Sequence, residues 1–396
     1  MIALLLSPIY IVFNIYIIRW LLAWMSCCHK AFKTKLSKII TISFYSFLAS
    51  AIFIGFLLPQ GNIKRVFNGI GNFFIGAMIY IILCILVCDL IRIILIKTNK
   101  YHQDSLYKTR ILVIIGAINI IVISTICIYG AINARIIHTT KYEVTINKKV
   151  SNIKNLNIVM VADLHIGNNI GIKHIKRMVE AINKENADVV IMAGDIFDND
   201  YDTIEKPKEL IKILKTIKSK NGVYAVYGNH DIKEKILAGF TFNYNNQKYS
   251  DPRMDKLLKN ADIKLLQDES VILYNEIQIY GRPDYKKPNR NIIKRKTPKE
   301  LSNTLDKTKP IIVIDHEPFE LEQLSQNGID LDLSGHTHAG QIFPENLFLG
   351  LIYQNPYGYK KINNMHSIVT SGVGVYGPNM RVGTIAEITS IKVNFL

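Results

Sequence analysis

Five short clusters of acidic, amide and imidazole residues stand out in the last two-thirds of the sequence. Each follows an apolar run typical of a buried strand, and together they hold five of the chain's ten histidines. The clusters are Asp163-Leu164-His165, Gly194-Asp195-Ile196-Phe197-Asp198, Gly228-Asn229-His230-Asp231, Asp315-His316-Glu317 and Gly335-His336-Thr337-His338. Because open α/β sheets usually place their sites beyond the carboxyl ends of strands, we expect the clusters to converge.

The residue types in these clusters favour a metal-dependent hydrolase. Residues two apart in extended backbone project to the same side, so Asp163 with His165, and His336 with His338, can reach one cavity. Oxygen and imidazole ligands suit manganese, iron or zinc. All five cysteines lie at or before Cys127, which excludes thiolate ligands from the clusters. A carboxylate shared by two ions, about 3.5–4 Å apart, would form the clamp used in phosphoryl hydrolysis.

Each cluster alone has an ordinary structural explanation. A single Asp-x-His is common at surfaces, and Gly-Asp or Gly-Asn-His-Asp can simply form a turn. Two histidines directly after an apolar strand, as in Gly335-His336-Thr337-His338, have little structural use. All five clusters in this order within residues 163–338 therefore indicate one shared site.

The ordered motifs resemble those of the calcineurin-like metallophosphoesterase superfamily, which run Asp-x-His, Gly-Asp, Gly-Asn-His-Asp/Glu, a lone His and Gly-His-x-His. The resemblance covers roughly Asn157 to Ile388. The versions here look most like a bacterial membrane-associated branch that acts on phosphodiesters; they read ADLHIG, AGDIFD, YGNHD, DHEP, SGHTHAGQIF and SGVGVYGPNMRVG. Protein phosphatases of the superfamily usually have Arg-Gly where Asn199-Asp200 follow Asp198 here, so a protein phosphatase is disfavoured.

The resemblance implies a binuclear centre of divalent ions, with manganese, iron and zinc as candidates. One ion would have the ligands Asp163, His165, Asp195 and His338. The other would have Asp195, Asn229, His316 and His336, with Asp195 bridging the two ions. A metal-bound hydroxide would then attack phosphorus in line.

The resemblance also implies a catalytic role for His230. Its imidazole would protonate the leaving oxygen as a general acid, or stabilise the pentavalent transition state as a cation. Asp198 is the expected partner that orients His230, with Asp231 as the alternative.

Alternating apolar and helical patterns predict the elements that position these residues. Strands are expected at 157–162, 189–193, 223–227, 277–280, 311–314, 331–333 and 368–370, and helices near 173–183 and 204–217. This order favours a layered α/β sandwich, assigned to residues 151–396.

The first third of the chain predicts an all-α transmembrane bundle. Apolar stretches long enough to cross about 30 Å of hydrocarbon occur near 2–25, 39–58, 70–88 (or 70–96) and 111–134. Residues 1–134 are therefore assigned to a four-helix membrane anchor, and residues 135–150 to a linker. Residues 1–140 hold thirteen Lys/Arg against two acidic residues, so most of the net charge of +16 flanks the membrane. This placement explains the basic charge without nucleic acid, which is disfavoured as a partner.

Loop charge predicts how these spans are oriented. The loops after the first and third spans hold four Lys/Arg each, whereas the second loop holds only Lys64 and Arg65. The positive-inside rule makes the first and third loops cytoplasmic. Four crossings then place the N-terminus and the catalytic domain outside the cytoplasm, at the cell membrane.

The sequence therefore predicts a membrane-anchored hydrolase of a phosphodiester, surrounded by membrane lipids and acting on a lipid-linked or envelope substrate. A phosphomonoesterase, or a nucleotide or nucleic-acid phosphodiesterase, would share the metal site and stays open. From a different class, a membrane sensor that binds a ligand without turnover also stays open. No protein partner can be inferred.

Overall fold

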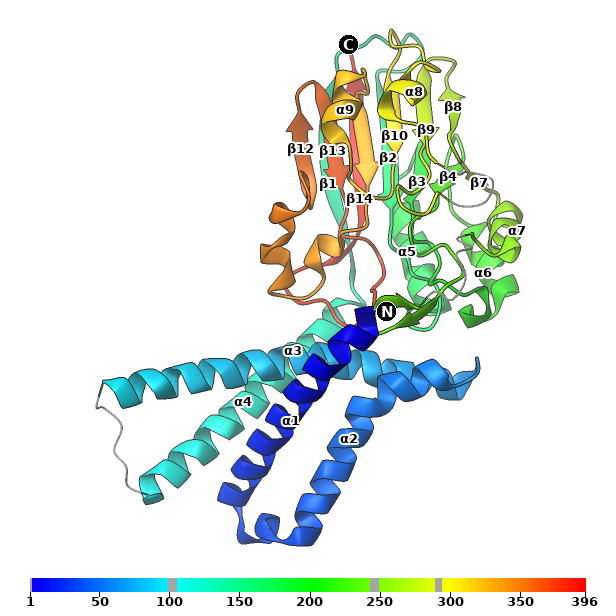
Figure 1. Cartoon of the computed structure of the whole chain (residues 1–396). Helices are drawn as coiled ribbons and strands as arrows, with labels where there is room; N and C mark the ends of the chain where they lie inside the picture. The colour runs from blue at the N-terminus through cyan, green and yellow to red at the C-terminus, as the bar shows by residue number, and fades with distance from the viewer. Residues whose placement is uncertain (1, 99–104, 243–248, 289–293) are drawn as a thin grey trace. The chain divides into compact units, whose positions relative to one another are not determined.

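The computed structural model describes residues 2–98, 105–242, 249–288 and 294–396 (Figure 1). The chain divides into two compact units. The first comprises Met1–Ile132, Ile236–Phe242 and Gly377–Met380. The second comprises Asn133–Lys235, Asn243–Tyr376 and Arg381–Leu396.

Four long apolar helices make up most of the first unit. They are α1 (Ile2–Cys28), α2 (Lys35–Leu57), α3 (Asn62–Lys97) and α4 (Ser105–Asn133), with the 3-10 turn η1 (Lys30–Lys33) between the first two. Within the described part of the chain, these four helices are long and apolar enough to cross a membrane. The predicted all-α transmembrane bundle is therefore confirmed, and α3 is longer at both ends than the apolar stretch expected at 70–88.

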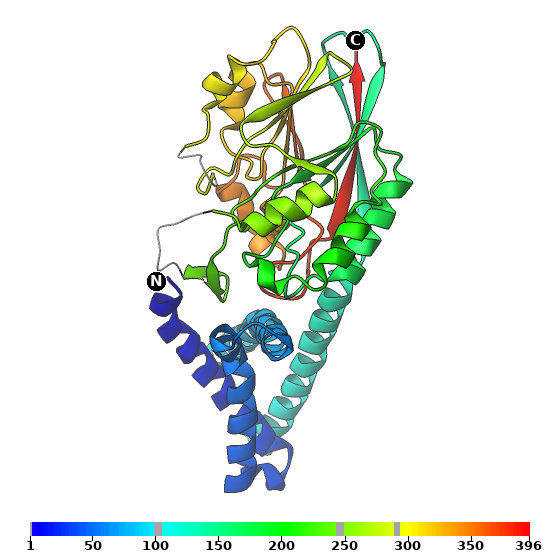
Figure 2. The same cartoon turned by 90° about the vertical axis from the view of Figure 1, so that its right-hand side faces the viewer.

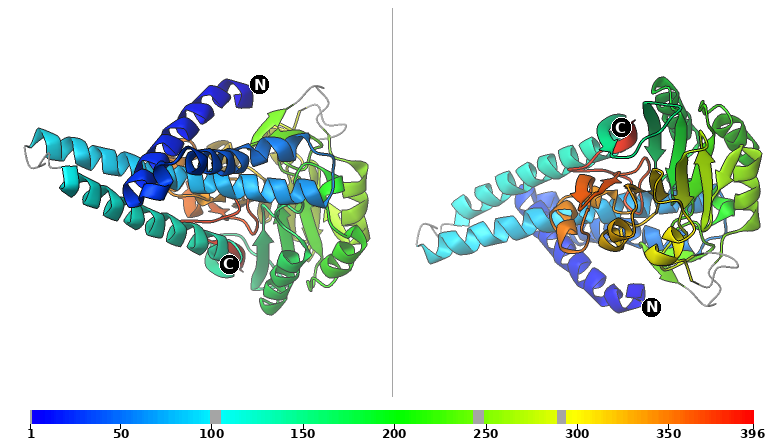
Figure 3. Two further views of the ribbon diagram at one scale, coloured as in Figure 1. Left: turned by 90° about the horizontal axis from the view of Figure 1, so that it is seen from below. Right: turned by 90° about the horizontal axis from the view of Figure 1, so that it is seen from above.

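Hydrogen bonds and close backbone approach join these helices. The hydroxyl of Tyr45 in α2 donates to Oδ1 of Asn14 in α1 at 2.7 Å. At the contact of α2 with α3, a Cβ placed on Gly71 would lie 2.6 Å from Cα of Ile52, so the backbones meet closely there (Figure 3). Small residues and interhelical hydrogen bonds replace the hydrophobic effect as packing forces within lipid.

The first of two six-stranded sheets in the second unit has the order β1-β14-β2-β3-β4-β7. Its strands are β1 (Ile137–Ile146), β14 (Ala386–Phe395), β2 (Asn155–Val161), β3 (Val189–Ala193), β4 (Val223–Val226) and β7 (Ile263–Leu265). Strands β2, β3, β4 and β7 are parallel, and β14, red in Figure 2, is antiparallel to β2. Strand β1 occupies ten residues of the segment 135–150 that was expected to be a linker.

The second sheet has the order β12-β13-β11-β10-β9-β8. Its strands are β12 (Gly358–Ile362), β13 (Met365–Val369), β11 (Leu331–Ser334), β10 (Ile311–Ile314), β9 (Ile277–Gly281) and β8 (Glu269–Leu273). The four inner strands are parallel, and both edge strands are antiparallel to their neighbours. Strands β5 (Lys235–Leu237) and β6 (Phe240–Phe242) form a separate pair.

The two sheets pack face to face, and helices cover their outer faces. Helices α5 (Ile172–Lys184), α6 (Pro207–Leu214) and α7 (Pro252–Asn260) pack on the first sheet, and α8 (Pro298–Ser302) and α9 (Leu321–Gln326) pack on the second. In β10, Ile312 and Ile314 enter the core between the sheets, whereas Ile311 and Val313 face the helices. Parallel strands buried on both faces read as continuous apolar runs, which explains why they were predictable. The expected layered α/β sandwich is confirmed.

Short 3-10 turns complete the second unit. They are η2 (Tyr201–Thr203), η3 (His338–Gly340), η4 (Glu345–Leu347) and η5 (Leu349–Leu351). The last three follow β11 in close succession, so one irregular segment leads from that strand to β12.

Candidate metal centre

The five polar clusters lie in the loops that follow β2, β3, β4, β10 and β11. In each sheet these strands are parallel, so within a sheet the loops emerge at the same edge. Side chains from both sheets meet there: His316 from the second sheet contacts Asp195 from the first. The structure therefore brings the predicted clusters together at the carboxyl ends of the strands, as open α/β sheets favour.

Sharp turns place the donor atoms. Asp163 and Asp195 have φ of 52° and 49°, a left-handed conformation that costs energy for residues other than glycine. A Cβ at Gly194 would lie 2.4 Å from Nδ1 of His316, and one at Gly228 would lie 2.3 Å from Oδ1 of Asp195. A Cβ at Gly228 would also lie 2.6 Å from Cδ2 of His316, so the absence of a side chain at both glycines allows the loops of the two sheets to approach each other.

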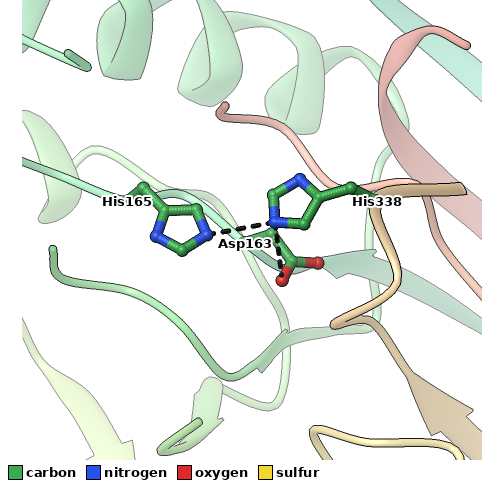
Figure 4. Close-up of side chains that lie close together, drawn as sticks. All are labelled: Asp163, His165 and His338. Atoms are coloured by element: carbon green, nitrogen blue, oxygen red, sulfur yellow. Dashed lines mark hydrogen bonds and ion pairs between the residues drawn. The ribbon is translucent and has the colours of Figure 1, made fainter. Parts of the chain in front are cut away.

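Asp163, His165 and His338 form the first group of converging donor atoms (Figure 4). Nε2 of His165 lies 3.1 Å from Nε2 of His338. Nε2 of His338 lies 3.5 Å from Oδ1 of Asp163. All three residues are buried, and their ligand atoms lie within 4.8 Å of one another. Two imidazole nitrogens and a carboxylate oxygen at these separations can hold one cation.

Asp195, His316 and His336 form the second group. Oδ2 of Asp195 lies 3.2 Å from Nε2 of His316, and the same nitrogen lies 3.1 Å from Nδ1 of His336. Oδ1 of Asn229 lies 3.0 Å from Nε2 of His316, so the amide oxygen joins this group. All seven residues predicted to be metal ligands thus lie in two adjoining groups.

Asp195 lies between the two groups. Its Oδ2 is 3.7 Å from Nε2 of His165 in the first group and 3.2 Å from Nε2 of His316 in the second. Its Oδ1 accepts a hydrogen bond of 2.7 Å from the backbone N–H of His230, which holds the carboxylate in this orientation. One carboxylate therefore faces both groups, as a bridging ligand must.

Burial sets the charge state of the histidines. It lowers the pKa of His165 to about 3, and it lowers the pKa of His336 and His338 well below the ordinary 6.5. At His316 burial also lowers the pKa, but the nearby carboxylates, first that of Asp195 and then those of Asp163 and Asp284, together raise the pKa well above 6.5. His165, His336 and His338 thus offer neutral imidazole lone pairs, whereas the carboxylate of Asp195 attracts positive charge at His316.

Acceptors behind the rings of the second group fix their orientation. Nδ1 of His316 donates to the carbonyl oxygen of Ala193 at 2.9 Å, which leaves Nε2 for the site. Oε1 of Glu317 lies 3.4 Å from Nε2 of His336, so Nδ1 of that ring faces the site. Such acceptors behind imidazole ligands are typical of metal centres. The donor types, their charge states and this support all fit divalent cations.

His230 lies beside the first group. Its ring centroid is 5.4 Å from that of His165 and 4.3 Å from that of Tyr376. Nδ1 of His230 donates to Oδ1 of Asn199 at 2.7 Å, and the backbone N–H of Asn199 donates to the carbonyl oxygen of His230 at 2.9 Å. Asn199 therefore holds both the ring and the backbone of His230 and leaves Nε2 of the ring available.

The structure corrects the expected partner of His230. The resemblance implied Asp198, with Asp231 as the alternative, but Nδ1 of His230 donates its hydrogen bond to Oδ1 of Asn199. The carboxylate of Asp231 instead accepts two backbone N–H groups, at 2.8 and 2.7 Å, and so joins the loops after β3 and β4. Asn199 has a φ of 59°, a left-handed conformation that turns the backbone. Because of this turn, the side chain of Asn199, and not that of Asp198 before it, contacts His230.

Two further supporting residues were not assigned a role from the sequence. Glu317 follows a predicted ligand directly, and that adjacency was the only signal for it. Arg381 is fully buried, and its Nη2 lies 3.3 Å from Nδ1 of His338 while it donates to the carbonyl oxygen of Ser371 at 2.6 Å. Its position in the glycine-rich SGVGVYGPNMRVG segment gave no indication that it reaches this ring.

Comparison with known proteins agrees with this geometry. Residues 156–340 match the model of the calcineurin-like phosphoesterase family. A Helicobacter pylori protein named as an uncharacterized metallophosphoesterase is 32% identical over 241 residues, which cover 60% of this chain and 60% of that relative. The matched region therefore spans less than two thirds of that relative's length.

The names of two other relatives mention a membrane and a substrate. A transmembrane protein with metallophosphoesterase domain from Danio rerio is 28% identical over 283 residues, covering 69% of this chain and 61% of the relative. The UDP-2,3-diacylglucosamine pyrophosphatase of Chlamydia trachomatis is 23% identical over 240 residues, covering 52% of this chain and 70% of the relative.

The family match spans the loops that carry the two groups of donors, and the four apolar helices precede it. The motifs, their convergence and the relatives all point to the same chemistry. Residues 156–340 of this chain therefore form a calcineurin-like phosphoesterase domain, which follows four helices that are long and apolar enough to cross a membrane in the part of the chain that the structure describes.

Proposed function

We propose that this protein hydrolyses a phosphodiester at a centre of two divalent metal ions. The observation that carries the proposal is the position of Asp195, whose Oδ2 lies 3.7 Å from His165 and 3.2 Å from His316. A carboxylate shared by two groups of oxygen and nitrogen donors is the arrangement that clamps a phosphoryl group in two-metal hydrolases.

Each ion has four ligands in this proposal. The first is held by Asp163, His165, Asp195 and His338. The second is held by Asp195, Asn229, His316 and His336. Manganese, iron and zinc are the candidates, because all donors are oxygen or imidazole nitrogen. When bound, the ions supply a Lewis acid and positive charge at the phosphoryl group.

The protein's own contribution to the reaction is proton transfer and orientation. Burial lowers the pKa of His230 to about 4, so its ring takes up a second proton, at Nε2, only beside the negative charge of a bound phosphoester. His230 donates this proton from Nε2 to the leaving oxygen, while Nδ1 donates to Asn199, which holds the ring for the transfer. Lys286 provides a cation at the edge of the centre: its side chain is 63% exposed, and its Nζ lies 3.8 Å from Oε1 of Glu317. A mobile ammonium group there can meet the negative charge of a phosphoester.

Two observations support a lipid-linked or envelope substrate at the outer face of the membrane. The described part of the chain has four helices long and apolar enough to span a bilayer. One relative is named as a pyrophosphatase of UDP-2,3-diacylglucosamine, a nucleotide sugar that carries two acyl chains. The basic loops after the first and third spans support the extracytoplasmic orientation.

The test compares bis(4-nitrophenyl) phosphate, a diester, with 4-nitrophenyl phosphate, its monoester. The full chain, purified in detergent, is assayed with manganese, with zinc and after metal removal. The variants are His230→Ala and Asp195→Asn, and the matched control is His138→Ala, which changes an exposed histidine on β1.

We expect metal-dependent turnover, faster on the diester, that Asp195→Asn loses and the control keeps. His230→Ala should lower turnover of these esters less than turnover of an alkyl diester, because 4-nitrophenolate leaves without protonation. Preference for the monoester would replace the proposal with a phosphomonoesterase. Metal binding without turnover of either ester, in a folded chain, would favour the ligand sensor instead.

A further inference from the structure

The segment Phe343–Ile352, which we name the apolar loop, presents five large apolar side chains to solvent. Their exposed fractions are 43% for Phe343, 64% for Leu347, 56% for Phe348, 85% for Leu351 and 67% for Ile352. The only charged residue in the loop is Glu345. Single exposed apolar residues are common, but a contiguous patch of them marks an interaction surface.

The apolar loop, among the orange turns of Figure 1, is held firmly on the second unit. The backbone N–H of Phe343 donates to the carbonyl oxygen of Val382 at 2.9 Å, and the N–H of Glu345 donates to that of Ile342 at 2.8 Å. The turns η4 and η5 follow, and Leu349 between the exposed residues is buried. The exposed side chains are therefore displayed by a defined backbone.

A row of aromatic rings connects the apolar loop to the metal centre. Tyr353 follows the loop directly, and its ring centroid lies 6.0 Å from that of the ligand His336. Phe319 lies 5.7 Å from Tyr353, and Tyr285, which is 53% exposed, lies 5.8 Å from Phe319. An apolar surface thus runs from the loop to the edge of the centre.

The chain itself indicates what covers this surface. Helix α4 ends at Asn133, where the second unit begins, and β1 begins at Ile137, so three residues separate a candidate membrane span from the first strand of the second unit. Three residues reach roughly 10 Å at most. Nδ2 of Asn133 also donates to the carbonyl oxygens of Arg381 and Thr384, at 3.1 and 2.8 Å, within the second unit. The second unit is therefore always tethered close to the membrane, and the lipid of that membrane is an apolar environment that the exposed side chains of the apolar loop can enter.

We propose that the apolar loop inserts into the lipid surface of the membrane and admits lipid-anchored phosphoesters to the centre. The acyl chains of the substrate stay in the lipid beside Leu347, Phe348 and Leu351, while the phosphoester reaches His336 along the aromatic row. Apolar elements that lie in the interface bury their side chains about 5–10 Å deep, at the boundary of head groups and acyl chains. The delivery of substrate rests on the function proposed above, whereas the contact with lipid does not.

The first experiment measures contact of the apolar loop with lipid by fluorescence and does not depend on enzymatic activity. In the full chain, with its five native cysteines replaced by alanine, a single cysteine at Leu351→Cys carries an environment-sensitive fluorophore. The matched control is Ile272→Cys on β8, an apolar residue that is 58% exposed. Both proteins are reconstituted into phosphocholine vesicles that contain lipids with a doxyl quencher near the head group.

We expect blue-shifted, lipid-quenched emission at position 351 and neither effect at 272. Equal, unquenched emission at both positions would overturn the inference. A blue shift at 351 without quenching by lipid would also overturn it, because a second copy of the chain would then cover the loop.

The second experiment measures turnover of a diester that carries an acyl chain in mixed vesicles, beside bis(4-nitrophenyl) phosphate in solution. Loss of one lipid-buried leucine in Leu351→Ser weakens partitioning roughly tenfold. We therefore expect the apparent KM for the vesicle substrate to rise by roughly that factor, with turnover of the soluble diester unchanged, and no effect of Ile272→Ser. An unchanged KM would overturn the delivery role. Absence of all turnover, with quenching at 351 intact, would sink the proposed function and leave the lipid contact standing.

Discussion

Replacement of Asn199 tests the catalytic proposal most directly. Its φ of 59° suits glycine, so Asn199→Gly removes the side chain without straining the backbone. The variant loses the hydrogen bond of 2.7 Å to Nδ1 of His230 and the bond of 3.2 Å from Nδ2 to the carbonyl oxygen of Ile232. It keeps the backbone N–H bond to the carbonyl oxygen of His230, so the loop stays in place.

The size of the effect follows from the two lost bonds. A neutral hydrogen bond contributes roughly 0.5–1.5 kcal/mol net. If the bond to His230 orients the proton donor in the transition state, its loss raises the barrier by about 1.4 kcal/mol, a tenfold loss of rate. The bond to Ile232 acts on folding alone, so its loss lowers the free energy of unfolding by about 1 kcal/mol.

The assay compares two diesters that differ only in their leaving group. 4-Nitrophenolate leaves without protonation, whereas an alkyl alkoxide needs a proton from the general acid. We expect Asn199→Gly to lower kcat about tenfold for the alkyl diester and far less for the nitrophenyl diester. Asn199→Asp, which retains an oxygen acceptor for Nδ1, is the control and should preserve discrimination between the diesters.

Either of two outcomes would refute this reasoning. Equal losses on both diesters would show that Asn199 supports the centre as a whole and not proton donation by His230. Unchanged rates on both, with the unfolding free energy lowered as expected, would show that the hydrogen bond to Nδ1 has no part in catalysis.

Three further predictions concern metals, pH and orientation. Removal of metal by a chelator should lower the melting temperature, since binding at a hundredfold excess over Kd stabilises by about 2.7 kcal/mol, and Asp195→Asn should respond much less. Burial raises the pKa of Asp332 from 3.8 to about 7, so the folded state loses stability as pH rises through that window. Asp332→Asn should therefore be more stable than the parent above pH 7, by up to about 4 kcal/mol, and the gain should vanish near pH 4 in thermal unfolding; a pH-independent difference would contradict this. In the cysteine-free chain, Ile272→Cys should react with an impermeant maleimide in right-side-out membrane vesicles, and reaction only in inverted vesicles would reverse the proposed orientation.

The strands found from the sequence and those missed differ in burial. Val189–Ala193 and Ile311–Ile314 are buried on both faces, so their apolar runs were plain in the sequence. Strand β1 is an edge strand whose Thr, Lys and Glu side chains are largely exposed, and its sequence looked like a linker. It is held in place by β14, which lies 240 residues further along the chain, so local pattern could not reveal the pairing.

The candidate donor residues of the centre could be predicted because only a few residue types can bind a metal ion. Carboxylate, amide and imidazole donors in ordered motifs indicated the two groups before their geometry was known. The supporting contacts were not predictable in this way. An aspartate and an asparagine can both accept a hydrogen bond from Nδ1 of His230. The direction of one turn decides that Asn199, and not Asp198, does so.

The sequence by itself determined which parts this protein has: four apolar stretches long enough to span a membrane, alternating strands and helices, and seven residues of the types that bind divalent metals. Spacing and hydrophobic periodicity carry that information because they act locally. Only the tertiary structure decided that Asp195 lies between the two groups of donors, that Asn199 holds His230, and that the apolar loop is exposed beside the centre. Asp195 takes its position where the two sheets meet, and the contact of Asn199 with His230 joins the loops after β3 and β4. Distances between loops that are far apart in the sequence depend on packing that no local pattern encodes.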